Sequence, residues 1–514
     1  MMSQKRLRLQ SRHSRNHTKR LSASLNNHDN KTVIMKTTKV ISKYLAHYAE
    51  NLSPWLDGFS RNNPFQRCVV IPAFDESTYF IDRLNNQAPD NTLIILVLNC
   101  PKTCTPLQRS NTLKVKEHLL DLGQSIWQGS KDNAVQLIQT PSTHWLVWDI
   151  TGWNDITPID TFVPGVGYAR KLGMDSALLL FSQNQITAPF FLSTDADALL
   201  PNDYFELPSL VNQYTQKERT NCSGYIFPFQ HDYLTNSPSK EESNTTSIAA
   251  SIYEMSLRYY VLGLRWAESP WGFHTIGSTL AIHAFHYAAN RGFPKREAGE
   301  DFYLLNKIAK TGTVISLKKP VITLSDRASH RVPFGTGPAV QRIQQLDSIV
   351  NEFRLYHPSC FEWLKLWQLA IPRLYTQPLT VSLIEVQSDV EVCEKIHGIL
   401  LALNIEKAIN HSRKQSKSAD DFYRHMLTWF DAFKTLKFIH TARNKYLPSL
   451  KLCEWIQAIE LSNIPFITQP APSQLKWIQL TENLSQKDLQ CKINHLSQHL
   501  TALDQSTLPH TSSI

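Results

Sequence analysis

The sequence lacks any apolar run long enough to cross a bilayer. Its longest runs, such as residues 92–98, are far shorter than the roughly 20 residues that a spanning helix needs. None of the eight cysteines forms a Cys-x-x-Cys pair, and Cys100 and Cys104 have no second pair at zinc-binding spacing. Ordinary thiols of this kind are typical of a reducing compartment. We therefore expect a soluble, cytoplasmic protein with no transmembrane segment, while peripheral contact with a membrane stays open.

Excess positive charge is also lacking from most of the chain. The net charge is +9, but residues 1–40 carry ten Lys and Arg against Asp29 alone, which leaves 43 basic and 43 acidic residues for the remainder. A nucleic-acid-binding body would carry its own basic face, so we expect no nucleic-acid partner. Residues 1–37 read as a basic, disordered tail without the apolar core of a signal peptide, and Met35 is an alternative start.

What the chain does contain is an alternation of short apolar runs and helix-length segments. Residues 68–71, 93–98, 145–150 and 190–192 are predicted strands, and the second is continuously apolar, as parallel strands buried on both faces are. An amphipathic leading helix is expected within residues 38–64. The pattern predicts an α/β domain over residues 65–338, a helical region over 339–505 that could mediate oligomerisation, and a frayed end over 506–514.

Two carboxylates, Asp195 and Asp197, follow the predicted strand at residues 190–192. Like charges this close raise the cost of ionising each other, and a hard divalent cation such as Mg²⁺ or Mn²⁺ removes that cost. The carboxyl end of a strand is also where open α/β sheets bind ligands. The alternative is an N-cap before a helix entered through Pro201.

Two further segments have a chemical and an ordinary interpretation. The glycine-opened helix at residues 165–175 carries Arg170 and Lys171, which could face a diphosphate or simply form a solvated helix face. Glu300 and Asp301 begin another helix, where acids are favoured by the helix dipole and where a general base could also sit. The dipole would keep such a base ionised.

Taken in order, these segments resemble family 2 glycosyltransferases. Residues 70–76 resemble the opening strand and turn of the family, residues 167–173 its Gly-Ala-Arg-Gly helix, and residues 195–197 its Asp-x-Asp. Residues 276–279 with 292–294 resemble its acceptor loop, and Glu300-Asp301 its catalytic pair. The match in order and spacing covers roughly residues 65–335. The resemblance implies a GT-A fold, which is a doubly wound mixed α/β sheet that binds a nucleotide-diphosphate sugar, and Mn²⁺ or Mg²⁺ as cofactor.

On the donor side, the resemblance implies roles for residues of four motifs. The nucleoside would lie beside Pro72, Ala73 and Glu76, and the base or ribose beside Asn99. The diphosphate or sugar would lie near Gly167, Arg170 and Lys171. Asp195 and Asp197 would flank the metal and the ribose, with Asp197 as the principal ligand.

On the acceptor side, the resemblance implies that Gly277, Ser278 and Thr279 meet the acceptor. Asp301 would be the base, with Glu300 beside it. The resemblance also implies inversion of configuration at the anomeric carbon, which suits a single base that acts opposite the leaving group.

The sequence departs from the family at several positions. Asp75 stands where the family often has Asn, and Asn99 stands where an acid is common, so the nucleotide stays open. No Gln-x-x-Arg-Trp motif occurs, which is unlike a processive polysaccharide synthase. His330 is a candidate for an additional metal ligand or an ordinary loop histidine, and Arg327 and Arg331 could hold the diphosphate or an anionic acceptor.

Together these features predict a metal-dependent, inverting transfer of a sugar from a nucleotide-diphosphate donor to an acceptor hydroxyl. One alternative is a sugar-phosphate nucleotidyltransferase, which would need an early Gly-rich loop with Arg and Lys that residues 72–76 do not provide. Another is a non-catalytic nucleotide-sugar-binding or scaffold protein whose helical region carries the function. The presence of both acidic pairs weighs against the scaffold.

Overall fold

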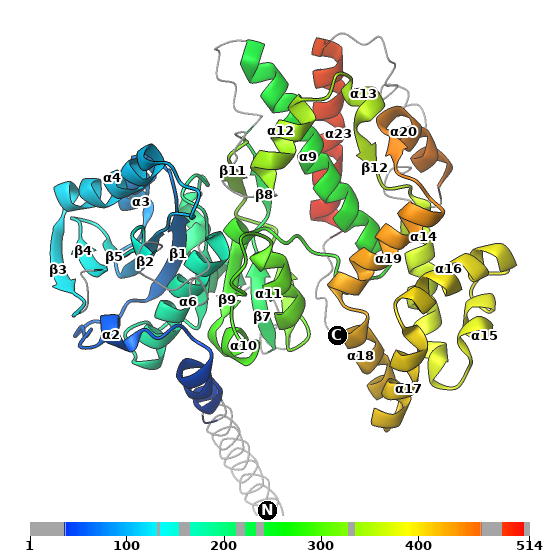
Figure 1. Ribbon diagram of the computed structural model, residues 1–514, viewed down its shortest axis with the longest axis horizontal. Helices are drawn as coiled ribbons and strands as arrows, with labels where there is room; N and C mark the ends of the chain where they lie inside the picture. Colours follow the sequence, from blue (N-terminus) through cyan, green and yellow to red (C-terminus); the bar gives the residue numbers. More distant parts are fainter. Residues whose placement is uncertain are drawn as a thin grey trace, which may run out of the picture.

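The structure is a computed structural model that describes residues 35, 37–130, 134–153, 165–211, 221–232, 241–326, 335–462, 464 and 486–507. Figure 1 shows an α/β half built on a large sheet beside a half composed mainly of helices. Among the described residues, no helix is both long and apolar enough to cross a bilayer.

The α/β half is organised around a nine-stranded mixed sheet with the order β10-β7-β9-β6-β1-β2-β5-β4-β3. Its centre is parallel: β6 (Phe190–Ser193), β1 (Arg67–Ala73), β2 (Thr92–Leu98) and β5 (His144–Asp149). Antiparallel pairing joins β9 (Leu280–His283) to β6 and β7 (Cys222–Ile226), and β4 (Val135–Gln139) to β5 and β3 (Gln124–Gln128). β10 (Thr313–Ser316) is parallel to β7, and β8 (Phe229–His231) and β11 (Ile322–Leu324) form a separate parallel pair. The mixed α/β sheet expected from the sequence is confirmed.

Helices cover both faces of the parallel centre, which explains its continuous apolar strands. Alternate residues of β1 enter different cores: Val70 packs with α6 (Val166–Ser182), whereas Val69 and Ile71 pack with α3 (Tyr79–Gln87) and α4 (Pro106–Leu122). α6 approaches so closely that a Cβ on Gly173 would lie 2.4 Å from Cγ1 of Val70. The sheet and α6 therefore form one tightly packed unit.

The leading helix is shorter than expected, because helical residues run only to 47 and a separate short helix, α2 (Ser53–Leu56), follows. Tyr44 is buried on this helix, whereas Tyr48, just after it, is 38% exposed. The Glu50 N–H donates to Oδ2 of Asp175 in α6 at 2.8 Å, so the chain is tied to α6 just after the helix ends. Packing against α6 thus sets where the leading helix ends.

The expected helical C-terminal region is also confirmed. Its α-helices in the described part of the chain are α12 (Thr336–Gln344), α13 (Ile349–Glu352), α14 (Ser359–Ala370), α15 (Leu379–Ile384), α16 (Val390–Ala402), α17 (Ile405–Gln415), α18 (Ala419–Trp429), α19 (Ala432–Lys445), α20 (Leu452–Leu461) and α23 (Gln486–Ser506).

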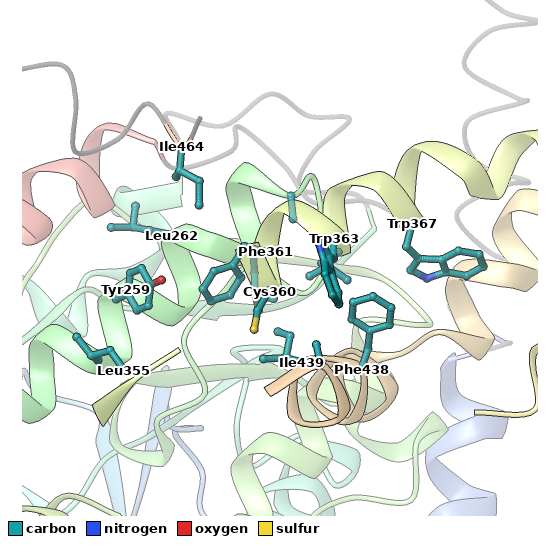
Figure 2. Close-up of a cluster of buried hydrophobic side chains, with 14 of the residues drawn as sticks. Tyr259, Leu262, Leu355, Cys360, Phe361, Trp363, Trp367, Phe438, Ile439 and Ile464 are labelled. Atoms are coloured by element: carbon teal, nitrogen blue, oxygen red, sulfur yellow. The ribbon is translucent and has the colours of Figure 1, made fainter. Parts of the chain in front are cut away.

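The helical region has an apolar core of its own, part of which is drawn in Figure 2. Phe361 and Trp367 of α14 meet Phe438 and Ile439 of α19 in this core, together with Tyr259 from the long helix α9 (Glu241–Trp266). A Cβ on Gly263 of α9 would lie 2.6 Å from the Phe361 ring, so α9 and α14 pack closely. Because α9 follows β8 of the α/β half, it joins the two halves of the molecule.

Candidate functional site

The ends of three neighbouring strands bring several of the expected donor-side residues together. Strands β6, β1 and β2 are adjacent and parallel, so their carboxyl ends meet at one edge of the sheet. Asp195 and Asp197 follow β6, residues 72–76 form the end of β1 and its turn, and Asn99 follows β2. The Asn99 N–H donates to the carbonyl of Ala73 at 3.0 Å, which joins two of these ends directly. This edge is the candidate site.

Arg170 joins the strand-end carboxylates to the acidic pair of α11 (Glu300–Ile308). Its guanidinium is buried and makes three contacts, with Nε 2.8 Å from Oε1 of Glu300, Nη1 2.8 Å from Oγ of Ser193, and Nη2 2.5 Å from Oδ1 of Asp195. Burial opposes its charge, but Asp195 and Glu300 outweigh burial and raise the pKa of Arg170. One side chain therefore links the two acidic motifs.

The expected acceptor loop lies against the same guanidinium. Gly277 begins a short 3₁₀ turn (Gly277–Thr279), and a Cβ there would lie 2.7 Å from Nη2 of Arg170, so the position has no room for a side chain. Ser278 and Thr279 are buried, and the Thr279 hydroxyl donates to the carbonyl of Ile276 at 3.0 Å. The structure thus brings residues 277–279, Arg170 and the acidic pair together.

Asp301 has the protonation behaviour of a base that is poised near neutral pH. Burial, and then the charge of Glu300, raise the pKa of Asp301 to about 7, while the Phe302 and Gly277 backbone hydrogen bonds and Arg170 lower it in part. The N–H of Phe302 donates to Oδ1 of Asp301 at 2.7 Å. The helix N-terminus alone was expected to favour the ionised carboxylate, but burial outweighs that effect here.

The carboxylates at the end of β6 have the oxygen chemistry of a hard divalent cation site. Asp195 and Asp197 are both partly accessible, and a phosphate-bearing ligand would complete such a shell. Arg83 of α3 supports the intervening loop, because its Nη2 donates to the carbonyl of Ala198 at 2.6 Å and of Ala196 at 3.3 Å. Among the described residues, no group of three or more His, Cys, Asp or Glu side chains could by itself hold a metal.

Three candidates from the sequence, Arg327, His330 and Arg331, lie outside the described residues. Strand β11, which precedes them in the chain, forms an isolated bridge with the loop after Asp197: the Leu199 N–H donates to the carbonyl of Thr323 at 2.7 Å.

Lys171 lies in a different place from Arg170, although the two are consecutive. Its ammonium is buried 2.9 Å from Oδ2 of Asp175 and donates to Oη of Tyr44 at 2.8 Å and to the carbonyl of Tyr48 at 3.1 Å. Oδ1 of Asp175 also accepts hydrogen bonds from Tyr44 at 2.6 Å and Tyr287 at 2.8 Å. In the structure Lys171 therefore holds the leading helix to α6.

Gly167 is likewise packed against protein. Its N–H donates to the carbonyl of Arg296 at 3.2 Å, and a Cβ on Gly167 would lie 2.4 Å from that oxygen. This glycine is therefore required for the close approach of residues 294–296 to α6, and its N–H is already bonded.

Asp75 occupies a left-handed backbone conformation, with φ of 53°. Asp and Asn tolerate this conformation better than most residues, which explains why either suits the turn after the first strand. Its side chain is held by α4, since Nδ2 of Asn111 donates to Oδ1 of Asp75 at 3.0 Å. The turn is thus fixed by protein contacts.

Sequence reasoning named Asn99 at this edge but missed Thr194. Two buried side-chain oxygens there, Oδ1 of Asn99 and Oγ1 of Thr194, have no hydrogen-bond partner among the residues that the structure describes. Such groups are uncommon in folded proteins and are explained when a ligand supplies the partner. Thr194 could have been suspected as a hydroxyl placed directly after an apolar strand.

Tyr253 of α9 is a further missed residue, and no local sequence pattern indicates it. Burial raises its pKa to about 12, the hydrogen bond with Thr336 opposes that rise, and the charge of Asp301 adds to it, so the phenol is within electrostatic range of Asp301.

No protein-family model matches the chain, and a search of curated proteins gives no match. The fold and site define an α/β protein with carboxylates at the edge of a mixed sheet where the carboxyl ends of its parallel strands meet.

Proposed function

We propose that this chain is a GT-A-type glycosyltransferase that moves a sugar from a nucleotide diphosphate to an acceptor hydroxyl, with metal dependence and inversion. The observation that carries the proposal is the double ion pair of Arg170, with Asp195 at 2.5 Å and Glu300 at 2.8 Å. It brings the Asp-x-Asp motif and the acidic pair of α11 to one place. These are the two groups that such a reaction requires at the donor and at the acceptor.

The proposed chemistry is a single displacement. The acceptor oxygen forms a bond to the anomeric carbon, the bond from that carbon to the diphosphate oxygen breaks, and Asp301 takes the hydroxyl proton. A Mn²⁺ or Mg²⁺ held by Asp197 and Asp195 would neutralise charge on the departing diphosphate. With a pKa of about 7, Asp301 is both substantially ionised at neutral pH and basic enough to accept a proton.

The orphaned oxygens support a nucleotide at the same edge. Oδ1 of Asn99 is a hydrogen-bond acceptor and suits an N–H group of a base or a ribose hydroxyl. Residues 72–76 lie beside Asn99 because β1 pairs with β2 from Arg67↔Thr92 to Ala73↔Leu98. The nucleoside would therefore lie over the ends of β1 and β2, with its diphosphate towards Asp195.

A panel of nucleotide sugars tests this function. Thermal unfolding of the wild-type chain and of Asp197→Ala should be followed with each sugar, with Mn²⁺ and with chelator. We expect one nucleotide class to stabilise the wild type with Mn²⁺ only and to leave Asp197→Ala unaffected. Stabilisation by no nucleotide sugar, or equal stabilisation with chelator, would contradict the proposal.

A non-catalytic nucleotide-sugar-binding protein is the second candidate, favoured by the commitment of Asp195 to Arg170. The two candidates differ in turnover. A glycosyltransferase releases nucleoside diphosphate from its bound donor, by transfer or slowly to water, whereas a binding protein returns the nucleotide sugar intact.

A further inference from the structure

The turn between α18 and α19 contacts both elements that carry the acceptor half of the site. On one side, the indole Nε1 of Trp271 donates to the carbonyl of Phe430 at 3.0 Å. On the other, Oδ2 of Asp431 is 2.6 Å from Nζ of Lys310, just beyond the end of α11. Trp271 lies six residues before Gly277 in the chain, and Lys310 lies nine residues after Asp301. Residues 430–432, which we call the support turn, therefore bridge the two elements.

Asn306 of α11 fixes the register of this contact. Its Nδ2 donates to Oδ2 of Asp431 at 3.1 Å, and its Oδ1 accepts from the N–H of Ala432 at 3.0 Å. Both ends of the amide are thus paired with adjacent residues of the support turn. A two-point contact of this kind restricts sliding and rotation of α11, whose first turn bears Glu300 and Asp301.

A second contact comes from the last helix of the chain. Asp504 of α23 lies 2.9 Å from Nε2 of His274 and 2.6 Å from Nη1 of Arg265, and the Nε of Arg265 donates to the carbonyl of Gly272 at 2.8 Å. His274 stands three residues before Gly277. All three charged or polar side chains are at least nine-tenths buried. The approach to the acceptor loop is therefore held by α23 as well as by the support turn.

We propose that the helical region positions the acceptor half of the site, with Asp431 and Asp504 as positioning residues for α11 and for residues 271–279. The inference rests on the proposed function for its meaning in catalysis, but the mechanical coupling can be tested separately. It gives the helical region a role in the reaction, because movement of α18, α19 or α23 would displace the base and the acceptor loop relative to the donor carboxylates.

Hydrogen–deuterium exchange tests the coupling without knowledge of any substrate. The probes are peptides covering residues 270–282 and 300–308, with residues 92–98 as an internal reference in the sheet. Asp431→Asn removes the charge facing Lys310 but keeps an oxygen that can accept from the N–H of Lys434, as Asp431 does at 3.0 Å. Lys310→Met removes the same ion pair from the α/β side, so a folding defect in one variant leaves the other informative.

The matched control is Asp389→Asn. Asp389 caps α16 in the same region by accepting from the N–H groups of Glu391 and Val392 at 3.0 and 3.2 Å, far along the chain from the support turn. We expect exchange in residues 300–308 to accelerate about tenfold in Asp431→Asn and Lys310→Met, to stay at the wild-type rate in Asp389→Asn, and to leave residues 92–98 unchanged. Wild-type exchange in both test variants would overturn the proposal.

Enzymology then separates this inference from the proposed function. With UDP- and GDP-sugars and Mn²⁺, Asp431→Asn should lower kcat for nucleoside diphosphate release while leaving the donor KM close to that of the wild type. If exchange changes but the wild type binds no nucleotide, the coupling stands and the glycosyltransferase proposal fails. If the wild type turns over and Asp431→Asn matches it in kcat, the positioning role is overturned.

Discussion

Arg170 and Glu300, 130 residues apart in the chain, form a buried ion pair with 2.8 Å between Nε and Oε1. Their side chains are only 3% and 4% exposed, and the same guanidinium also reaches Asp195. Removing one partner of such a pair leaves a charge without compensation in a region of low dielectric constant. Arg170 is therefore a residue of the folded framework as well as of the site.

Arg170→Met should lower the free energy of unfolding by about 3–5 kcal/mol, because it leaves both Glu300 and Asp195 without their cation. Urea denaturation measures the change. The matched control is Arg424→Met, which removes an exposed ion pair with Asp421 in α18 and should cost at most about 1 kcal/mol. A loss in Arg170→Met as small as that of the control would show that Arg170 is dispensable to the fold.

Asp301→Asn should reduce turnover about 10²–10⁴-fold, because the amide keeps the shape of the side chain but cannot accept the hydroxyl proton. Affinity for the nucleotide sugar should change little, since the proposed donor position is over β1, β2 and β6. Steady-state kinetics and calorimetry of the same protein separate the two effects. Glu300→Gln is the comparison and should be milder; if it loses turnover while Asp301→Asn does not, the roles within the pair are reversed.

The rate should depend on pH through Asp301. Its pKa is raised to about 7, and only the ionised form can act as the base, so kcat/KM should fall about tenfold per pH unit below 7 and level off above it. The pH profile of the wild type measures this midpoint. A flat profile between pH 5 and 8, in a protein that stays folded, would place the base elsewhere.

Lys171→Met should destabilise the fold without weakening nucleotide binding. It breaks a buried pair with Asp175 at 2.9 Å and frees the leading helix, so we expect a loss of about 3–5 kcal/mol in the free energy of unfolding. Tyr44→Phe, which removes one hydrogen bond to the same carboxylate, should lose about 1–2 kcal/mol. A large loss of nucleotide affinity in Lys171→Met, at unchanged stability, would show that Lys171 contributes to the donor site.

The strands that build the site were predictable, because the apolar runs of β1, β2 and β6 are each followed within two residues by a polar residue. The edge strand β3 and its neighbour β4 were not predicted. β3 is short, ends in Gln at both termini and is mostly exposed, so it carries little of the apolar periodicity on which strand prediction depends. Its pairing with β4 also shifts register between Ser125 and Trp127, which weakens the pattern further.

The site itself was predictable in outline but not in orientation. Arg170 and Lys171 both looked suited to a diphosphate, yet consecutive helical residues point about 100° apart, so both cannot face one ligand. Lys171 and Asp175 stand four residues apart on one helix, and this spacing was a local signal that Lys171 forms an ion pair within the protein. The contact of Trp271 with Phe430 joins residues 159 apart, and no local pattern could have indicated it.

The most direct test of the proposed function is calorimetric titration of nucleoside diphosphate, with UDP and GDP each measured in Mn²⁺ and in chelator. The carboxylate pair predicts that one of them binds the wild type at least about tenfold more tightly with Mn²⁺, a difference of about 1.4 kcal/mol, and that Asp197→Ala loses this difference. Equal affinity with and without metal in the wild type, or no binding of either nucleotide, would contradict a metal-dependent nucleotide-sugar site at the end of β6.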